Sequence, residues 1–104
     1  MKAAALFSVF LMCLPALEAQ IADRAQLKLE GAVAFTEGPA WHPSGDVYFT
    51  DIANNRIMRR DPSGVMHVFR TPSGRANGLL FDHEGNLMAC EGGNRRVTRT
   101  EKDG

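Results

Sequence analysis

Residues 37–64 have the sequence EGPAWHPSGDVYFTDIANNRIMRRDPSG, and residues 77–104 have the sequence NGLLFDHEGNLMACEGGNRRVTRTEKDG. The two stretches align without a gap at an offset of forty residues, with six identities in 28 positions. The identical positions are Gly38, Gly45, Asn54, Arg56, Arg59 and Gly64 in the first stretch, with Gly78, Gly85, Asn94, Arg96, Arg99 and Gly104 in the second. Regular spacing of this kind indicates an internal structural repeat.

The pattern within each copy predicts short strands separated by turns. In the first copy the expected strands are residues 37–41, 47–51, 56–60 and 65–69, because they are rich in β-branched, aromatic and alternating side chains. Turns are expected between them where Pro, Gly and Asn cluster, since these residues favour turn conformations. Four short antiparallel strands with a period near forty residues are typical of a β-propeller blade.

A single blade buries only one of its faces, so a propeller needs a ring of ~4–8 blades. The chain supplies one whole blade repeat, about residues 37–76, and an incomplete second one, residues 77–104. The expected fold is therefore an all-β propeller of which about two blades are present. We expect such an N-terminal fragment to be inactive alone, and residues 21–35 to add a strand that closes the ring.

The charge balance excludes two classes of partner. Lys and Arg number 12, as do Asp and Glu, so the formal net charge is zero. Nucleic acids and anionic lipid surfaces are bound through a positive field, which this composition does not build. We therefore expect no nucleic-acid partner.

The first nineteen residues have the pattern of a secretory signal peptide. Lys2 is followed by the uncharged stretch 3–17, and Ala19 is a small residue at the expected cleavage point. The apolar run is shorter than the ~20 residues that span a bilayer, although an uncleaved anchor is the alternative. We predict export to the periplasm or cell exterior, a mature domain 20–104, and no stable membrane insertion after cleavage. Cys90 would then be the one cysteine left, without a disulfide and buried in its apolar run.

Two oxygen-bearing residues occupy the same place in successive repeats. Glu37 and Asn77 both begin the expected innermost strand, and a glycine follows each of them. In a propeller such positions face the central channel, where carboxylate and amide oxygens suit a hard cation such as Ca²⁺. Spacing alone favours the alternative, in which Glu37 is a solvated turn residue and Asn77 a left-handed turn residue.

Several motifs resemble the regucalcin and gluconolactonase family, also called the senescence-marker-protein or LRE-like family. They are FTEGPAW at 35–41, VYFTDI at 47–52 and RANGL at 75–79, with shorter matches at 55–57, 81–82, 85–87 and 95–97. The resemblance covers residues 35–104. It implies a six-bladed propeller with a divalent metal in its channel, for which Ca²⁺ is the favoured ion.

The resemblance also implies roles for three residues. By position, Glu37 matches the family's first metal-ligand glutamate. Asn77 matches an asparagine that faces the metal pocket and binds substrate or, in some members, the metal. Arg75 matches a residue that in some members contacts substrate, with an exposed surface arginine as the alternative. The remaining ligands and the general base belong to later blades, so no catalytic residue is expected within this chain.

Other prominent side chains are expected to be structural. Trp41, Phe49 and Phe81 are predicted to lie in the core. The recurring arginines of the outer strands are predicted to form solvated faces. These arginines are Arg56, Arg59, Arg95, Arg96 and Arg99.

The function that the resemblance implies is the hydrolysis of a sugar lactone or similar cyclic ester by metal-activated water. The whole protein would then be a calcium-dependent carboxylic ester hydrolase. Two rivals stay open, because fold does not fix function. One is a non-catalytic extracellular propeller that binds a ligand or protein. The other is an organophosphate or ester hydrolase with the same metal channel.

Overall fold

The computed structural model describes residue 26 and residues 28–103, and within them the chain forms seven β-strands. The strands are β1 (Thr36–Trp41), β2 (Val47–Asp51), β3 (Arg56–Arg60), β4 (Met66–Arg70), β5 (Ala76–Phe81), β6 (Leu87–Glu91) and β7 (Arg96–Thr100). Each strand expected in the first repeat is present, with its ends within one residue of the prediction. The bounds of β5, β6 and β7 lie forty residues after those of β1, β2 and β3.

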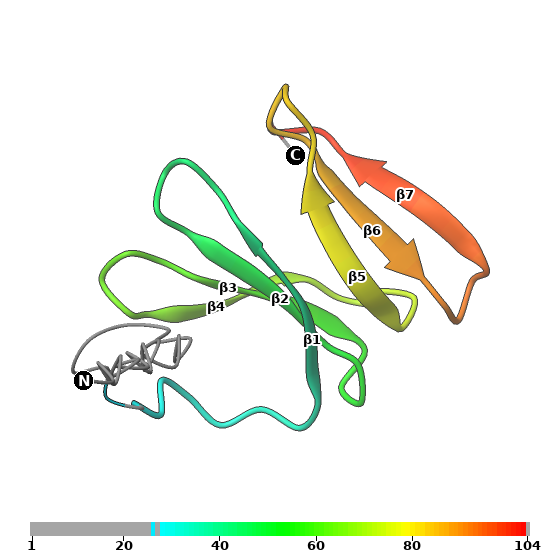
Figure 1. Ribbon diagram of the computed structural model, residues 1–104. Coiled ribbons are helices and arrows are strands. Elements are labelled where there is room, and N and C mark those ends of the chain that lie inside the picture. Colours follow the sequence, from blue (N-terminus) through cyan, green and yellow to red (C-terminus); the bar gives the residue numbers. More distant parts are fainter. Residues whose placement is uncertain (1–25, 27, 104) are drawn as a thin grey trace, which may run out of the picture.

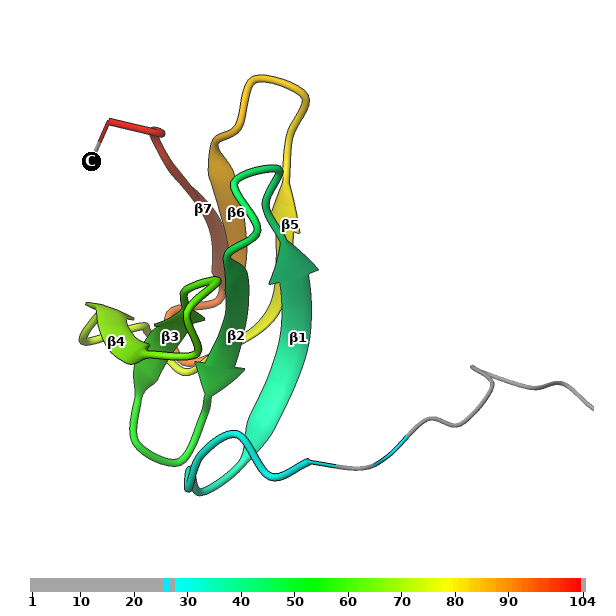
Figure 2. The same cartoon turned by 90° about the vertical axis from the view of Figure 1, so that its left-hand side faces the viewer.

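The strands form two antiparallel sheets (Figure 1). The first sheet has the order β1-β2-β3-β4, and the second sheet has the order β5-β6-β7. The sheets meet where β5 contacts β1 and β2, and Figure 2 shows β1 and β5 side by side. In each sheet the strands follow one another along the chain and are joined by short turns, and β1 and β5, the first strands of the two sheets, contact each other. This is the arrangement expected of adjacent propeller blades.

The turns repeat along with the strands. Gly45 and Gly85 have φ angles of 92° and 88° in the two β-hairpins that follow β1 and β5. Asn55 and Arg95 both have a φ of 52° in the hairpins that follow β2 and β6. The turn predicted where Asn54 and Asn55 follow one another is therefore confirmed, and Asn55 adopts the positive φ that asparagine tolerates. The two copies share the same backbone conformation, although only six of their 28 aligned positions have identical residues.

The core lies between the two sheets. Its buried apolar residues are Ala40, Ile57, Ala76, Leu79, Leu87 and Ala89, and Tyr48 and Phe81 pack against them. The Tyr48 ring meets Phe69 and Phe81 edge-on, with a centroid separation of 5.0 Å in each case. Burying these side chains against one another is what holds the sheets together, since neither sheet covers both of its own faces.

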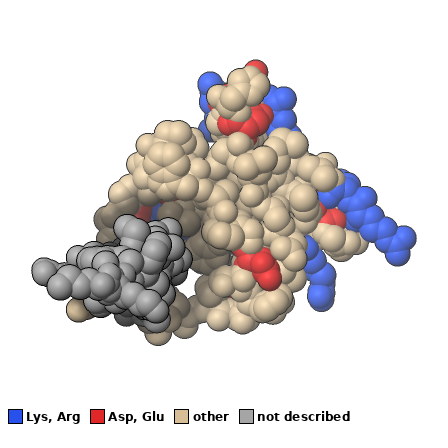
Figure 3. All heavy atoms as spheres, viewed as in Figure 1, with Lys and Arg blue, Asp and Glu red and all other residues tan. Residues whose placement is uncertain are grey.

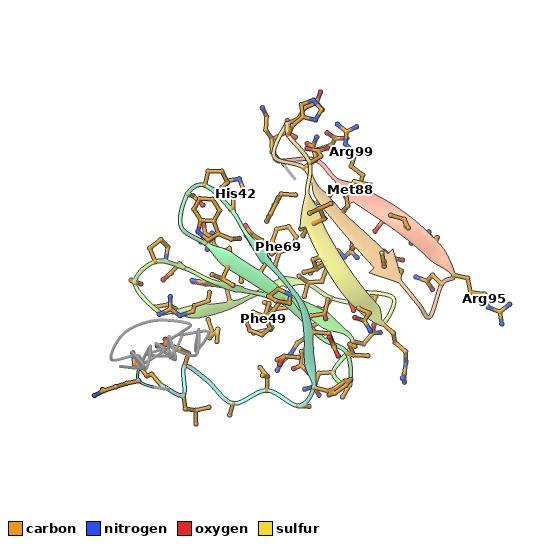
Figure 4. All side chains as sticks on the ribbon, in the orientation of Figure 1. His42, Phe49, Phe69, Met88, Arg95 and Arg99 are labelled. Carbon is orange, nitrogen blue, oxygen red and sulfur yellow. The ribbon has the colours of Figure 1, made fainter. Side chains whose placement is uncertain are left out.

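Two residues predicted to be buried are exposed. Trp41 is 65% exposed, and Cys90 is also exposed. The physical reason is the same for both: each side chain lies on the face of its sheet that is turned away from the other sheet. Phe49 lies on that outer face too, and Figure 4 shows it on the opposite side of the first sheet from Phe69. Of the three aromatic residues expected in the core, Phe81 alone packs against it.

The segment before β1 differs from the prediction where the structure describes it. Residues 26 and 28–35 form no strand, whereas a ring-closing strand was expected within 21–35. The predicted signal peptide, residues 1–19, lies outside the described residues. Among the residues that are described, no helix is long and apolar enough to cross a membrane.

Candidate functional site

Glu37 and Asn77 are the second residues of β1 and β5, the innermost strands of the two sheets. Their backbones lie next to each other. The Thr50 hydroxyl is 3.0 Å from the carbonyl oxygen of Glu37 and 3.0 Å from that of Asn77, so it bridges the two positions. Thr50 itself is fully buried, while Glu37 and Asn77 are exposed. The fold therefore brings together the two positions that the repeat singles out.

Gly38 makes this close approach possible. Its φ is +50°, in the left-handed region that favours glycine. A Cβ at this position would lie 2.1 Å from the carbonyl oxygen of Asn77 and 2.8 Å from the amide nitrogen of Leu79. No other residue fits without moving one of the strands. The glycine that follows Glu37 in the sequence thus serves strand packing at the site.

The side chains of Glu37 and Asn77 border different hollows on the surface. Glu37 lines one of about 410 Å³ on the outer face of the first sheet, together with Val47 and Phe49. Asn77 lines one of about 520 Å³ on the outer face of the second sheet, together with Cys90. Both side chains offer oxygen atoms that are free to meet a ligand from solvent.

The donors present suit part of a hard-cation shell. Ca²⁺ takes six to eight oxygen ligands, and a carboxylate and an amide oxygen are of the preferred type. Within residue 26 and residues 28–103 there is no group of three or more His, Cys, Asp or Glu residues placed to hold a metal ion. Glu37 and Asn77 each carry an oxygen donor of this type, their side chains border different hollows, and their role as ligands of one ion stays a prediction.

Arg75 lies just before β5, two residues from Asn77. It adopts a φ of 52°, and its backbone amide donates a 2.8 Å hydrogen bond to the Asn55 side-chain oxygen. The Asn55 side chain thereby fixes the loop that leads into β5. The Arg75 side chain is exposed at the same end of the sheets as Glu37 and Asn77. Its backbone is positioned by the first sheet, and its guanidinium is free for a ligand.

A buried carboxylate cluster closes the same end of the first sheet. Asp51 has no exposed surface and accepts hydrogen bonds from Asn54 at 2.8 Å and from Arg56 at 2.9 Å and 3.0 Å. Burial acts to raise the pKa of Asp51, but the donors Asn54 and Arg56, together with the Phe35 amide, outweigh it and lower the pKa. The cluster holds the β2–β3 turn in place.

The second sheet repeats this cluster and connects it to the first sheet. Glu91, 4% exposed, accepts hydrogen bonds from Asn94 at 2.7 Å and from Arg96 at 2.8 Å. Arg70, on β4 of the first sheet, reaches across to Glu91 at 2.9 Å. The Asn94 amide above all, followed by Arg96 and Thr98, lowers the pKa of Glu91 to about 2 against the effect of burial. An ion pair with Glu91 thus bridges the two sheets.

The prediction that Arg56 lies on a solvated face is wrong, since it is ion-paired with the fully buried Asp51. Arg96 is 62% exposed but also pairs with a buried carboxylate, Glu91. Arg95 fits the expectation, because it extends into solvent from the β6–β7 turn (Figure 4). The pairing of an arginine with a buried carboxylate could have been predicted from the motif D-x-x-N-x-R at 51–56, which is repeated as E-x-x-N-x-R at 91–96.

A further cleft lies at the opposite end of the sheets, between the β1–β2 and β5–β6 turns. It has a volume of about 650 Å³, and His42, Asp46 and Tyr48 are among its lining residues. His42 is hydrogen-bonded to Ser44 at 2.7 Å, and Ser44 in turn bonds to Asp46, which stabilises the β1–β2 turn. These groups serve turn geometry, and the cleft is separate from the Glu37–Asn77 end.

Acid is expected to weaken the fold through Glu91. The pKa of Glu91 lies near 4.5 in an unfolded chain and at about 2 in the folded protein. The ionised carboxylate therefore stabilises the fold fully above about pH 4.5, and this stabilisation is lost as the pH falls toward 2. Thermal unfolding midpoints should therefore drop between about pH 5 and pH 2. In a Glu91→Gln chain the same titration should be shallower, and an equally steep curve would show that other groups cause the drop.

Comparison with known proteins agrees with this architecture. Residues 35–104 match the family model described as the SMP-30/Gluconolactonase/LRE-like region. A search of curated proteins returned no significant match. Among solved structures, a gluconolactonase from Xanthomonas campestris is 28% identical with a TM-score of 0.64, and the match covers 68% of this chain and 24% of that one.

Two further structures give similar values. A putative gluconolactonase is 32% identical with a TM-score of 0.63, covering 67% of this chain and 24% of that one. A streptogramin B lyase is 27% identical with a TM-score of 0.60, covering 66% and 24% respectively. The chain thus spans about a quarter of the length of these structures, and its two sheets match a portion of a six-bladed propeller. Since the family model covers more than half of the sequence, the chain belongs to the SMP-30/gluconolactonase/LRE-like family.

Proposed function

We propose that this chain is part of a metal-dependent hydrolase that opens a sugar lactone or a similar cyclic ester. The observation that carries the proposal is the pairing of Glu37 and Asn77: equivalent positions of adjacent sheets, both oxygen-bearing and exposed, with their backbones bridged by Thr50. Membership in a family that includes gluconolactonases supports the reaction class. The activity is proposed for a whole propeller, of which this chain supplies about a quarter.

Each of the three site residues has a proposed role. Glu37 holds a divalent cation, for which Ca²⁺ is the best match to carboxylate and amide oxygens. Asn77 orients the substrate and adds an oxygen to the same ion. Arg75 binds the carboxylate that forms when the ring opens, as a guanidinium does well. The metal, when bound, supplies Lewis-acid polarisation and an acidified water.

We also propose that the protein is exported. Lys2, the uncharged stretch 3–17 and Ala19 support a cleaved signal peptide, with the periplasm or cell exterior as destination.

A second candidate activity is elimination. The streptogramin B lyase shares this portion of the propeller at an identity close to that of the gluconolactonases. Hydrolysis adds the elements of water to the substrate, whereas elimination leaves a carbon–carbon double bond and adds no oxygen. A non-catalytic binding propeller is a further rival, and it has no need for paired oxygen donors at positions 37 and 77. An organophosphate or ester hydrolase with the same metal channel is another, and it would share these donors.

The proposal is tested by grafting residues 35–104 into the Xanthomonas campestris gluconolactonase in place of the matching segment. We expect the chimera to hydrolyse a sugar lactone in the presence of Ca²⁺ and to incorporate ¹⁸O from labelled water into the product. Glu37→Gln in this chimera should lower kcat/KM on the order of a hundredfold, because metal polarisation contributes several kcal/mol to the transition state.

The matched control is Glu84→Gln. Glu84 is an exposed glutamate in the β5–β6 turn, at the far end of the second sheet from Asn77, and its replacement should leave activity unchanged. A folded chimera that turns over no lactone would contradict the proposal. Ring opening without ¹⁸O incorporation would favour elimination instead.

A further inference from the structure

Arg75 has a backbone conformation that its residue type does not favour. Its φ of 52° lies in the left-handed region, where Gly, Asn and Asp are common and other L residues are strained. Asn55 and Arg95 share this φ in β-hairpin turns, whereas Arg75 lies in the loop from β4 to β5 that joins the two sheets. A strained residue persists only where its surroundings hold it, and such residues concentrate at functional sites. The contacts that hold Arg75 therefore bear on its function.

The side chain of Asn55 holds the loop from the first sheet. Its Oδ1 atom accepts a 2.8 Å hydrogen bond from the Arg75 backbone amide and a 3.2 Å hydrogen bond from the Ser73 hydroxyl. The Asn55 carbonyl oxygen accepts a further hydrogen bond, 2.9 Å long, from the Ser73 amide. Ser73 is fully buried, so the loop is anchored in the protein interior at this point. One asparagine thus contacts both ends of the segment 73–75.

The second sheet supports the loop from the other side. The Gly93 amide donates a 2.9 Å hydrogen bond to the Gly74 carbonyl oxygen. A Cβ at Gly93 would lie 3.0 Å from that carbonyl oxygen and 3.4 Å from the Arg75 Cβ, so the loop packs directly against the β6–β7 turn. The Arg75 backbone is therefore held between two turns, one from each sheet, while its side chain is exposed.

Arg75 differs from three arginines at the same end of the sheets. Arg56, Arg70 and Arg96 are each paired with a buried carboxylate, which fixes their guanidiniums. The Arg75 side chain is exposed, and the direction in which it leaves the loop is set by its backbone. Apart from the residues drawn in grey, most of the surface in Figure 3 is uncharged. The place where an anion binds such a surface depends on where a single guanidinium is held.

We propose that Asn55 is a positioning residue: its side chain holds the Arg75 backbone in the conformation from which the guanidinium binds the carboxylate of an opened sugar lactone. The inference rests on the proposed function, in which Arg75 binds that carboxylate. The repeat supports it, because the position equivalent to Asn55 is Arg95, whose side chain has no acceptor atom. Both residues adopt a φ of 52°, so the turn itself does not require an asparagine. The acceptor at position 55 serves the loop.

The test uses the lactonase chimera that carries residues 35–104, with gluconate as the probe for carboxylate binding. Asn55→Gly removes the acceptor and keeps a residue that adopts a φ of 52° without strain, so the variant should fold. Calorimetry should show gluconate binding weakened about fivefold, because fewer molecules hold Arg75 in its binding conformation. The affinity for Ca²⁺ should not change.

The matched control is Asn86→Ala. The Asn86 side-chain oxygen also accepts a backbone hydrogen bond, from the Lys102 amide at 3.2 Å, but at the opposite end of the sheets. Its loss should leave gluconate affinity unchanged. An equal loss of gluconate affinity in Asn55→Gly and Asn86→Ala would show a general structural effect and would contradict positioning.

A double-mutant cycle shows whether Asn55 acts through Arg75. Arg75→Ala should weaken gluconate binding by itself, and Asn55→Gly should then have no further effect, since both changes act on the same group. Fully additive losses, or unchanged gluconate affinity in either single variant, would overturn the proposal. These results concern gluconate binding, so they are distinct from a failure of lactone hydrolysis, which would contradict the proposed function instead.

Hydrogen exchange of the Arg75 amide gives a second measurement that needs no ligand. Exchange should be slow in the unmodified chimera and in Asn55→Asp, which keeps an acceptor oxygen, and faster in Asn55→Gly. Fast exchange of this amide in a folded Asn55→Asp chimera would show that the acceptor oxygen does not hold the loop, and would overturn the proposal.

Discussion

Replacing Gly38 by alanine is expected to destabilise the fold by about 2–5 kcal/mol. The left-handed conformation costs an L residue ~1–2 kcal/mol. Overpacking against the carbonyl oxygen of Asn77, which a Cβ would approach to 2.1 Å, costs about 1–3 kcal/mol more. Urea unfolding in dilute solution measures the loss directly as a lower midpoint.

The repeat offers a matched control for this change. Gly78→Ala puts the same methyl group at the equivalent position of the second sheet, where its nearest contact is 3.8 Å away. Its effect should be below roughly 1 kcal/mol, as for a strand glycine with open space. Equal losses at the two positions would mean that β1 and β5 do not pack as closely as the structure indicates.

Glu91→Gln is expected to cost about 3–5 kcal/mol, because it removes the charge that the Arg70 and Arg96 guanidiniums meet in a buried setting. Arg70 comes from β4, so the loss should also loosen the contact between the sheets. Chemical denaturation at neutral pH gives the size of the effect.

A double-mutant cycle separates the bridge between the sheets from the local cluster. Arg70→Met and Glu91→Gln should be strongly non-additive, since the two residues are in direct contact at 2.9 Å. Glu84→Gln, in an exposed pair with Arg99, should change stability by less than ~1 kcal/mol. Additive effects of Arg70→Met and Glu91→Gln would contradict the bridging role.

The strands could be predicted from sequence because their ends are set by local turn chemistry. Gly45, Gly85 and Asn55 adopt the positive φ values that their residue types favour, and the offset of forty then fixes β5, β6 and β7. Local signals of this kind need no knowledge of the tertiary structure. The adjacency of positions 37 and 77 followed from the same repeat.

Burial could not be predicted in the same way. Trp41 and Phe81 occupy equivalent positions of the repeat, yet Phe81 packs against the core and Trp41 is 65% exposed. A side chain is buried only if another sheet packs against its face of the strand. The alternation of side chains between the two faces is the same in β1 and β5, so it does not show which face that is. The arginine clusters were missed for a related reason, because a strand arginine has the same pattern whether solvated or paired with Asp51 or Glu91.

Calorimetric titration of Ca²⁺ into the lactonase chimera measures whether Glu37 is a ligand of a divalent cation. Glu37→Gln should weaken Ca²⁺ binding at least tenfold relative to the chimera with Glu37 intact, while Glu84→Gln leaves it unchanged. Equal Ca²⁺ affinity with glutamate and with glutamine at position 37 would show that the Glu37 carboxylate does not bind the ion.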